Sequence, residues 1–140
     1  MKHIKILITI FCVFFIFNKN KAQQITDTLN YVKQFEINKS NYIGQPFSQL
    51  LNNMTSLQPK TVNSLVGIWG QNSISFSCFN FTEKDKQYDK ETVYMIITWQ
   101  TPLSSSDTKS LTVQNGFLFT NDEKNYYGSK VIKDIEVLKN

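Results

Sequence analysis

The spacing of apolar residues changes once along this chain, at Pro59, and this change constrains the fold more than any other feature. Before Pro59 the apolar positions recur at i, i+3 and i+4, as on one face of a helix. After Pro59 they alternate, and Val, Ile, Thr and aromatic residues dominate, as on pleated strands. Helices followed by a run of strands predict an α+β domain.

Two helices are predicted before Pro59. The first covers about 26–37, where Thr26 or Asp27 can cap the start. The second begins at Pro46, because a first helical turn does not need the N–H that proline lacks, and it ends before Pro59. The apolar positions of the first helix are Ile25, Leu29, Val32 and Phe35, and those of the second are Phe47, Leu50, Leu51 and Met54.

The alternating part predicts an antiparallel meander. Asn115-Gly116 is the strongest reversal signal, because a type I′ hairpin turn needs positive φ at both central residues. Gly70-Gln71-Asn72 and the charged run from Glu83 to Lys90 mark two further reversals. A phase shift between Cys78 and Phe79 predicts a β-bulge. The expected strands are at about 61–69, 73–82, 92–101, 110–114, 117–121 and 126–138.

The predicted fold is therefore two N-terminal helices packed on one face of an antiparallel β-meander of about five to six strands. The strand at 92–101 has apolar residues on both faces, so we expect it to be central and covered on both sides. In layout, with Gly44 to Met54 as the local likeness, this resembles small helix-helix-sheet modules of the bacterial envelope, such as beta-lactamase inhibitor proteins and accessory lipoproteins of outer-membrane assembly. A likeness of layout implies no function.

Residues 1–22 have the pattern of a secretory signal peptide. Lys2 to Lys5 are basic, Ile6 to Phe17 are almost wholly apolar, and Asn18 to Ala22 are polar and end in a small residue. Twelve helical residues span about 18 Å, which is too short for a hydrocarbon core of roughly 30 Å. Cleavage after Ala22 leaves a single domain, 23–140, with no stable membrane anchor. An Arg-free chain rich in Asn, Lys, Ile and Phe favours a bacterial source, so we expect a periplasmic or extracellular protein.

The basic charge of the chain belongs to this leader. All fifteen basic residues are Lys, and four of them lie in residues 1–22, which contain no acid. Removing the leader leaves eleven basic and eleven acidic residues. A neutral domain lacks the basic surface that nucleic-acid binding needs, so no nucleic-acid partner is expected.

The composition also limits catalysis. His3 is the only histidine, so a mature chain has no Ser-His-Asp triad and no His-ligated metal. Cys78 sits among aromatic residues and is interpreted as a buried, inert thiol. The acids from Glu83 to Glu91 alternate with lysines and are interpreted as a solvated turn, with calcium binding or carboxylate catalysis as the alternatives. We expect no enzyme activity, no cofactor and no metal.

Three aromatic residues are the candidate contacts for a partner or ligand. Tyr126 and Tyr127 are adjacent, so one of them is expected to face outward from a strand, and Trp69 offers a stacking surface. We predict a non-catalytic protein-interaction module, with a binding, inhibitory or envelope-assembly role, that binds another protein of the envelope or exterior through a sheet edge or an open strand surface. The alternative is a binding protein for an apolar or carbohydrate small molecule, with a cavity between helices and sheet lined by Phe47, Leu51, Met95 and Trp99.

Overall fold

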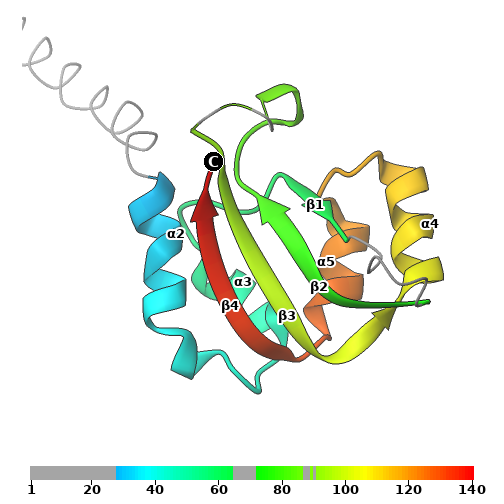
Figure 1. The fold of residues 1–140 in the computed structure, drawn as a ribbon, viewed down its shortest axis with the longest axis horizontal. Helices are drawn as coiled ribbons and strands as arrows, with labels where there is room; N and C mark the ends of the chain where they lie inside the picture. Colours follow the sequence, from blue (N-terminus) through cyan, green and yellow to red (C-terminus); the bar gives the residue numbers. More distant parts are fainter. Residues whose placement is uncertain (1–27, 65–71, 87–88, 90) are drawn as a thin grey trace, which may run out of the picture.

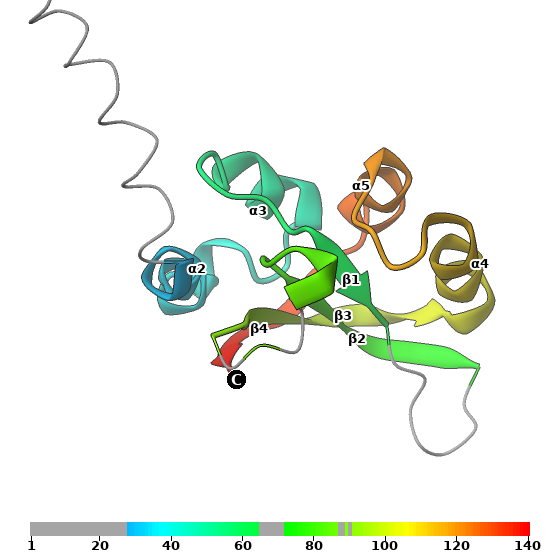
Figure 2. The same ribbon diagram turned by 90° about the horizontal axis from the view of Figure 1, so that it is seen from above.

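The structure is a computed structural model, and it describes residues 28–64, 72–86, 89 and 91–140. Within these residues a sheet of four antiparallel strands packs against four α-helices (Figure 1). Figure 2 shows that all four helices cover the same face of the sheet and that no described helix covers the other face. The predicted leader 1–22, the first helix's capping residues, Trp69 and Gly70-Gln71 lie outside the described residues.

The elements follow one another in a simple order. The helices are α2 (Thr28–Ile37), α3 (Phe47–Asn53), α4 (Ser105–Asn115) and α5 (Asn121–Gly128), with 3-10 helices η1 (Lys39–Asn41) and η2 (Lys84–Lys86). The strands are β1 (Thr61–Asn63), β2 (Ser73–Asn80), β3 (Val93–Ser104) and β4 (Ile132–Lys139), and they lie in the order β1-β2-β3-β4. The predicted α+β class and antiparallel sheet are confirmed, whereas the predicted number of strands is too high. None of the described helices is long and apolar enough to span a bilayer.

The two helices predicted before Pro59 are both present. In α2, Val32 and Phe35 are buried against the sheet. In α3, Pro46 stands at the N-cap, and the predicted apolar stripe is buried, including Met54 just after the last helical residue. The helical spacing of apolar residues and one proline were enough to predict α2 and α3, because each helix buries one continuous face.

The core lies between the helices and the covered face of the sheet. Its centre is aromatic: the ring of Phe47 lies 5.6 Å from that of Trp99 and 4.7 Å from that of Phe79. Further buried apolar residues come from all four strands and from α2, α3 and α5; they include Val32, Leu50, Val62, Ile74, Met95, Ile97, Tyr127, Ile132, Ile135 and Val137.

Register irregularities decide which β2 and β3 side chains face this core. The pairing of β2 with β3 shifts between Ile74 and Phe76, and not at the predicted position between Cys78 and Phe79. Ile74 and Ser77 therefore both point into the core, and Phe76 points to the other face. A serine can occupy position 77 in the core because its hydroxyl forms hydrogen bonds with Trp99 and Ser64.

The segment from 104 to 128 differs most from its prediction. It was expected to form strands at 110–114, 117–121 and the start of 126–138, and it forms α4 and α5 instead. The reason is capping: Ser104 accepts a hydrogen bond from the Asp107 N–H, and Thr120 and Glu123 form a complete capping box.

The Asn115-Gly116 pair is a helix end and not a hairpin turn. Gly116 has φ 58° and ψ 45°, and its N–H donates to the Thr112 carbonyl, which closes α4. A type I′ turn would need positive φ at both Asn115 and Gly116, whereas a helical C-cap needs it only at the glycine, and here Gly116 has positive φ and Asn115 does not. The hairpin prediction is wrong because two helix starts flank the pair.

Candidate functional site

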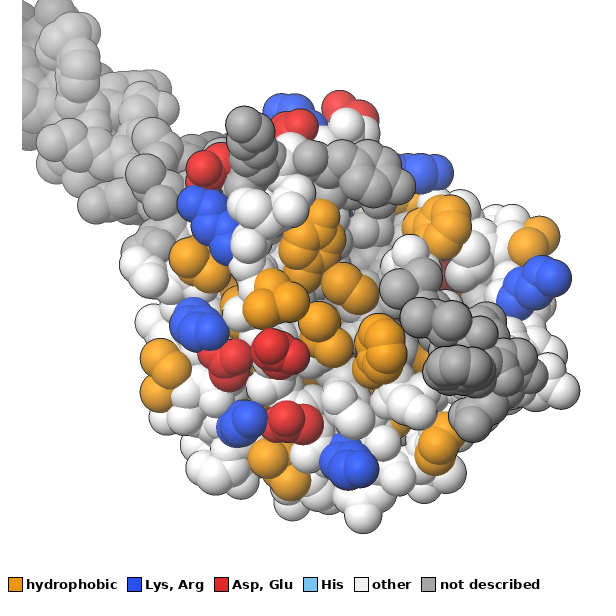
Figure 3. Space-filling view, in the orientation of Figure 1, with side chains coloured by type: hydrophobic (Ala, Val, Ile, Leu, Met, Phe, Trp, Pro, Cys, Tyr) orange, Lys and Arg blue, Asp and Glu red, His pale blue; other side chains and the backbone are white. Residues whose placement is uncertain are grey.

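The face of the sheet that no described helix covers, which we call the open face, is the main candidate for a binding surface. Apolar side chains cross it in a band, which we call the apolar stripe: Phe76 and Cys78 on β2, Tyr94 and Ile96 on β3, and Leu138 on β4. Phe76 is 37% exposed and Leu138 is 45% exposed. Figure 3 shows hydrophobic side chains gathered across the centre of this face, with charged side chains beside them.

The register explains why these residues meet. Cys78 pairs with Ile96, and Tyr94 pairs with Leu138, so directly opposite side chains share a face. Phe76 pairs with Thr98 one step further along the strands. The strand at 92–101 is central, as predicted, but the described residues cover only one of its faces: Tyr94, Ile96 and Thr98 remain partly exposed.

Charged residues lie along the β4 side of the apolar stripe. Lys33 forms an ion pair with Glu36, and Lys39 forms one with Asp134 at 2.7 Å. The pKa of Asp134 is lowered chiefly by its hydrogen bond from Lys39. Glu136 is exposed, stands opposite Ile96, and has no ion pair within 4 Å among the described residues.

The outer edge of β4 is occupied by the chain itself. Ile132 forms two hydrogen bonds with the segment that precedes α3. Its N–H donates to the Gln45 carbonyl, and its carbonyl accepts from the Gly44 N–H. Val137 donates its N–H to Glu36 at 3.0 Å and accepts from Lys33 at 3.2 Å. The Asp134 carboxylate accepts from the Ile135 N–H. A further strand could pair here only by displacing these contacts.

The outer edge of β1 is occupied as well. Val62 donates its N–H to the Phe117 carbonyl, and Phe119 donates its N–H to the Lys60 carbonyl, both at 2.9 Å. Segment 117–119 therefore lies along β1 in the way a fifth strand would. The outer edges of β1 and β4 are thus both engaged by other segments of the chain.

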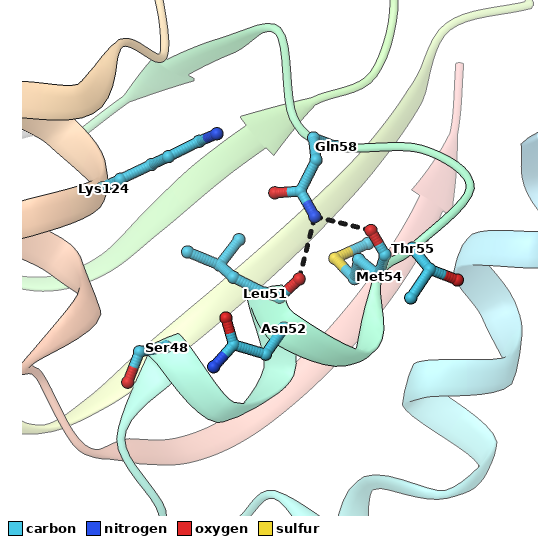
Figure 4. Close-up of a pocket in the computed structure, with 7 residues that line it drawn as sticks. All are labelled: Ser48, Leu51, Asn52, Met54, Thr55, Gln58 and Lys124. Atoms are coloured by element: carbon cyan, nitrogen blue, oxygen red, sulfur yellow. Dashed lines mark hydrogen bonds between the residues drawn. The ribbon is translucent and has the colours of Figure 1, made fainter.

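A second candidate is a pocket between helices α3 and α5, on the side of the molecule away from the apolar stripe. Its volume is about 470 Å³, within the range typical of small-ligand sites. Gln58 donates its side-chain N–H to the Leu51 and Met54 carbonyls at 2.8 and 2.5 Å, which holds the wall of the pocket in place (Figure 4). The other lining side chains are Ser48, Asn52, Thr55 and Lys124.

Among the described residues, Lys124 is the only charged one that lines this pocket, and it makes no ion pair with the others. Figure 4 shows its ammonium extending from α5 toward Gln58. The surrounding hydroxyl and amide groups can donate or accept hydrogen bonds. The arrangement suits a small polar ligand with one negative charge.

The α3–α5 pocket is not where the sequence predicted a cavity. Of the four residues expected to line that cavity, Phe47, Met95 and Trp99 are packed in the core. The fourth, Leu51, is one of the residues that line the α3–α5 pocket.

Tyr127, a predicted contact residue, belongs to the core. It is 2% exposed, and its ring stacks on Trp99 at 5.8 Å. Its hydroxyl is 2.9 Å from Ser64 Oγ, Ser64 Oγ is 2.6 Å from Ser77 Oγ, and Trp99 Nε1 donates to Ser77 Oγ at 3.0 Å. This chain of hydrogen bonds pairs the polar atoms of two buried aromatic side chains.

Tyr126, the second predicted contact residue, is half-buried on α5. Its ring lies edge-on to Tyr127 at 5.0 Å, and Lys130 Nζ lies 4.5 Å from its centroid. Burial, and to a smaller extent the electrostatic effect of Asp107 and Tyr127, raises the pKa of Tyr126 to about 12. The structure thus brings Tyr126 and Tyr127 together on the helical side, away from the apolar stripe. Trp69 lies outside the described residues.

Cys78 and Glu123 are two described residues with titratable groups whose surroundings shift their pKa. Burial raises the pKa of the Cys78 thiol to about 11, which suppresses the reactive thiolate. Glu123 is 1% exposed and is used to cap α5. In the part of the chain that the structure describes, no three His, Cys, Asp or Glu side chains converge in a way that could hold a metal ion.

Sequence reasoning missed the apolar stripe, although part of the signal was present. Tyr94, Ile96 and Thr98 were recognised as one face of a strand, but the covering of that face could not be read from periodicity. Comparison with known proteins adds no guide here: no protein-family model, curated protein or solved structure matches this chain.

Proposed function

We propose that this chain is an exported bacterial protein without enzymatic activity that binds another protein of the envelope or exterior through the open face of its sheet. The observation that carries the proposal is the apolar stripe, because a contiguous apolar patch on an exposed sheet face is a common mark of an interaction surface. The closed edges of β1 and β4 favour docking on the face over strand addition.

The chemistry of the chain supports a binding role over a catalytic one. Residues 23–140 contain neither His nor Arg, so the commonest general base and the bidentate anion clamp are both missing. The pattern of residues 1–22 supports export, and the resulting location is the periplasm or the exterior.

Site-specific photo-cross-linking tests this proposal in cells that produce the chain naturally. A photoreactive residue at Ile96 should give a discrete cross-linked adduct with the same protein in repeated experiments. The matched control is Val113, an apolar residue on α4 that is 77% exposed and distant from the open face. Adducts of equal yield and identity from both positions, or none from Ile96, would contradict the proposal.

The α3–α5 pocket supports a second candidate function, the binding of a small acidic carbohydrate. The Lys124 ammonium, which forms no ion pair within the described part of the chain, two hydroxyl groups and two carboxamides surround a space of about 470 Å³. A single Lys provides a point charge that suits a carboxylate. Uronic acids combine that charge with several hydroxyl groups.

Titration with glucuronate, followed by amide NMR, separates this function from the first. We expect resonances of α3 and α5 to shift with a dissociation constant of the order of 1 mM. Lys124→Gln should abolish the shifts, and Lys109→Gln, at an exposed lysine on α4, should preserve them. Equal shifts with uncharged glucose would show that Lys124 does not select the ligand.

A further inference from the structure

We infer that the partner presents an amphipathic α-helix to the apolar stripe, with a basic residue placed against Glu136. The inference rests on the proposed function and specifies its partner. It depends on three observations: the closed edges of β1 and β4, the dimensions of the apolar stripe, and the charges along its β4 side.

The occupied outer edges of β1 and β4 argue against a strand added at either of them. At β4 the backbone N–H groups of Ile132, Ile135 and Val137 already have acceptors within the chain. At β1, Val62 and Lys60 already pair with segment 117–119. An extended peptide would have to break several of these hydrogen bonds and would replace them with equivalent ones, so it would gain little.

The dimensions of the apolar stripe suit one helix. From the Phe76 row to the Tyr94 row it extends about 14 Å along the strands, and from β2 to β4 it extends about 10 Å across them. A three-turn helix is about 16 Å long and about 10 Å wide. The Phe76 and Leu138 positions lie on a diagonal of about 17 Å, so anchors at i, i+3 or i+4, i+7 and i+11, which span about 16 Å, would place apolar side chains over the Phe76, Ile96 and Leu138 positions.

The same dimensions argue against a second copy of this chain as the occupant. The apolar stripe covers on the order of 200 Å², whereas a stable protein dimer buries about 800 Å² on each partner. The side of the sheet at β4 does not extend the apolar surface, because Asp134 with its ion-pair partner Lys39, and the exposed Glu136, follow directly.

Charge sets the orientation of the proposed helix. Among the three acids near the β4 side, Glu36 and Asp134 are paired with lysines, and Glu136 is the one without an ion pair among the described residues. Glu136 stands opposite Ile96 in the register, so it borders the apolar stripe. A Lys or Arg flanking the apolar face of a bound helix would lie within reach of this carboxylate, which favours one direction and partner over others.

Two synthetic peptides of identical composition test the inference against the chain purified after export. One is a stapled helix of about 14 residues with Leu on one face and Arg beside it, because unstapled helices of this length are marginal in water. The other arranges the same residues with period two, as in a strand. Amide NMR titration reports both the site and the affinity.

We expect the helical peptide to shift resonances of β2, β3 and β4 around the apolar stripe, and the strand-patterned peptide to bind about tenfold more weakly. Leu138→Glu should reduce helix binding about tenfold, and Val113→Glu, the matched change on α4, should leave it unaltered. Both positions are exposed, so both variants should fold. Glu136→Lys should weaken the Arg-bearing helix, and a helix with Glu in place of Arg should bind this variant better than the original chain.

The possible failures are distinct. Equal binding of both peptides, or no effect of the charge exchange, would overturn the helix inference. If neither peptide shifts the open face while cross-linking at Ile96 still captures a partner, the inference fails and the proposed function stands. If the open face binds neither peptide and captures no partner, both fail.

Discussion

Glu123 offers the sharpest test of how this fold is held together. Its side chain is 1% exposed, yet it carries a carboxylate. That carboxylate accepts hydrogen bonds from the Thr120 N–H at 2.8 Å, the Thr120 hydroxyl at 2.5 Å and the Asn115 amide at 2.9 Å. It therefore joins the end of α4 to the start of α5. Glu123→Gln keeps the shape of the side chain and replaces one acceptor oxygen with a donor.

The magnitude follows from these three contacts. Hydrogen bonds to a charged acceptor contribute about 1.5–3 kcal/mol each when buried, and they are not additive. In Glu123→Gln one of the donors, from Thr120 or from Asn115, must face an NH₂ group. We expect a loss of about 2 kcal/mol in the free energy of unfolding, which corresponds to a decrease in Tm of about 8 °C for a domain of this size.

Urea denaturation measures the loss, and Asp122→Asn provides the matched control. Asp122 is the adjacent acid in the same helical turn, but it is exposed, and its side-chain contacts are long, at 3.4 Å. Its replacement should change stability by no more than about 0.5 kcal/mol. Equal effects of the two substitutions would refute the structural role of Glu123.

The pH dependence gives a second readout. Burial by itself raises the pKa of Glu123, but the hydrogen bonds from Thr120 and Asn115 outweigh burial, so the pKa lies below its ordinary value of 4.5. A depressed folded-state pKa means that this contribution is complete above pH 4.5 and is lost as the pH falls toward the folded-state value. The stability difference between the original chain and Glu123→Gln should therefore shrink on acidification. A difference that stays constant from pH 6 to pH 3 would contradict the assignment.

Three further predictions concern other parts of the fold. Ser77→Ala should lower the free energy of unfolding by about 1–3 kcal/mol, because it leaves the buried Trp99 N–H without an acceptor. The double change Ser77→Ala with Trp99→Phe should lower it by less than the sum of the two single changes. A Ser77→Ala variant as stable as the original chain in urea denaturation would count against this network. Iodoacetamide should alkylate Cys78 in the folded chain about 100-fold more slowly than a cysteine peptide at pH 8, with a rate that rises toward pH 11, and labelling at the peptide's rate would refute the burial of this thiol. Gly116→Ala should destabilise the chain by about 1 kcal/mol because φ is 58° at this position, and Gly116→Asn should cost less; the comparison fails if both variants melt at the original temperature.

The elements predicted correctly are those whose local pattern has one interpretation. The stripes of α2 and α3 follow helical spacing, and Pro46 and Pro59 bound the second of them. The strands β2, β3 and β4 are rich in β-branched and aromatic residues, which a helix accommodates less well. Each of these interpretations needs only neighbouring residues.

The region from 104 to 128 was mispredicted because its signals conflict. Leu111, Val113 and the aromatic residues after Gly116 favour strands, whereas Ser104 with Asp107 and Thr120 with Glu123 are capping pairs. These capping pairs are present in the sequence and correctly mark the starts of α4 and α5. They prevail because helix starts leave backbone N–H groups without partners, and these side chains satisfy them.

The sequence by itself determined the α+β class, the two helices before Pro59 and the approximate positions of the four observed strands, because each depends on a local periodicity. Only the tertiary structure decided which face of the sheet the described helices leave uncovered, since all four lie on one side and the register of β2 turns Phe76 away from them and Ser77 toward them. It also moved Tyr127 into the core and brought Phe76, Ile96 and Leu138 together from three strands. The physical reason is that burial is a property of packing between distant segments, and alternation along one strand does not specify which of its faces is covered.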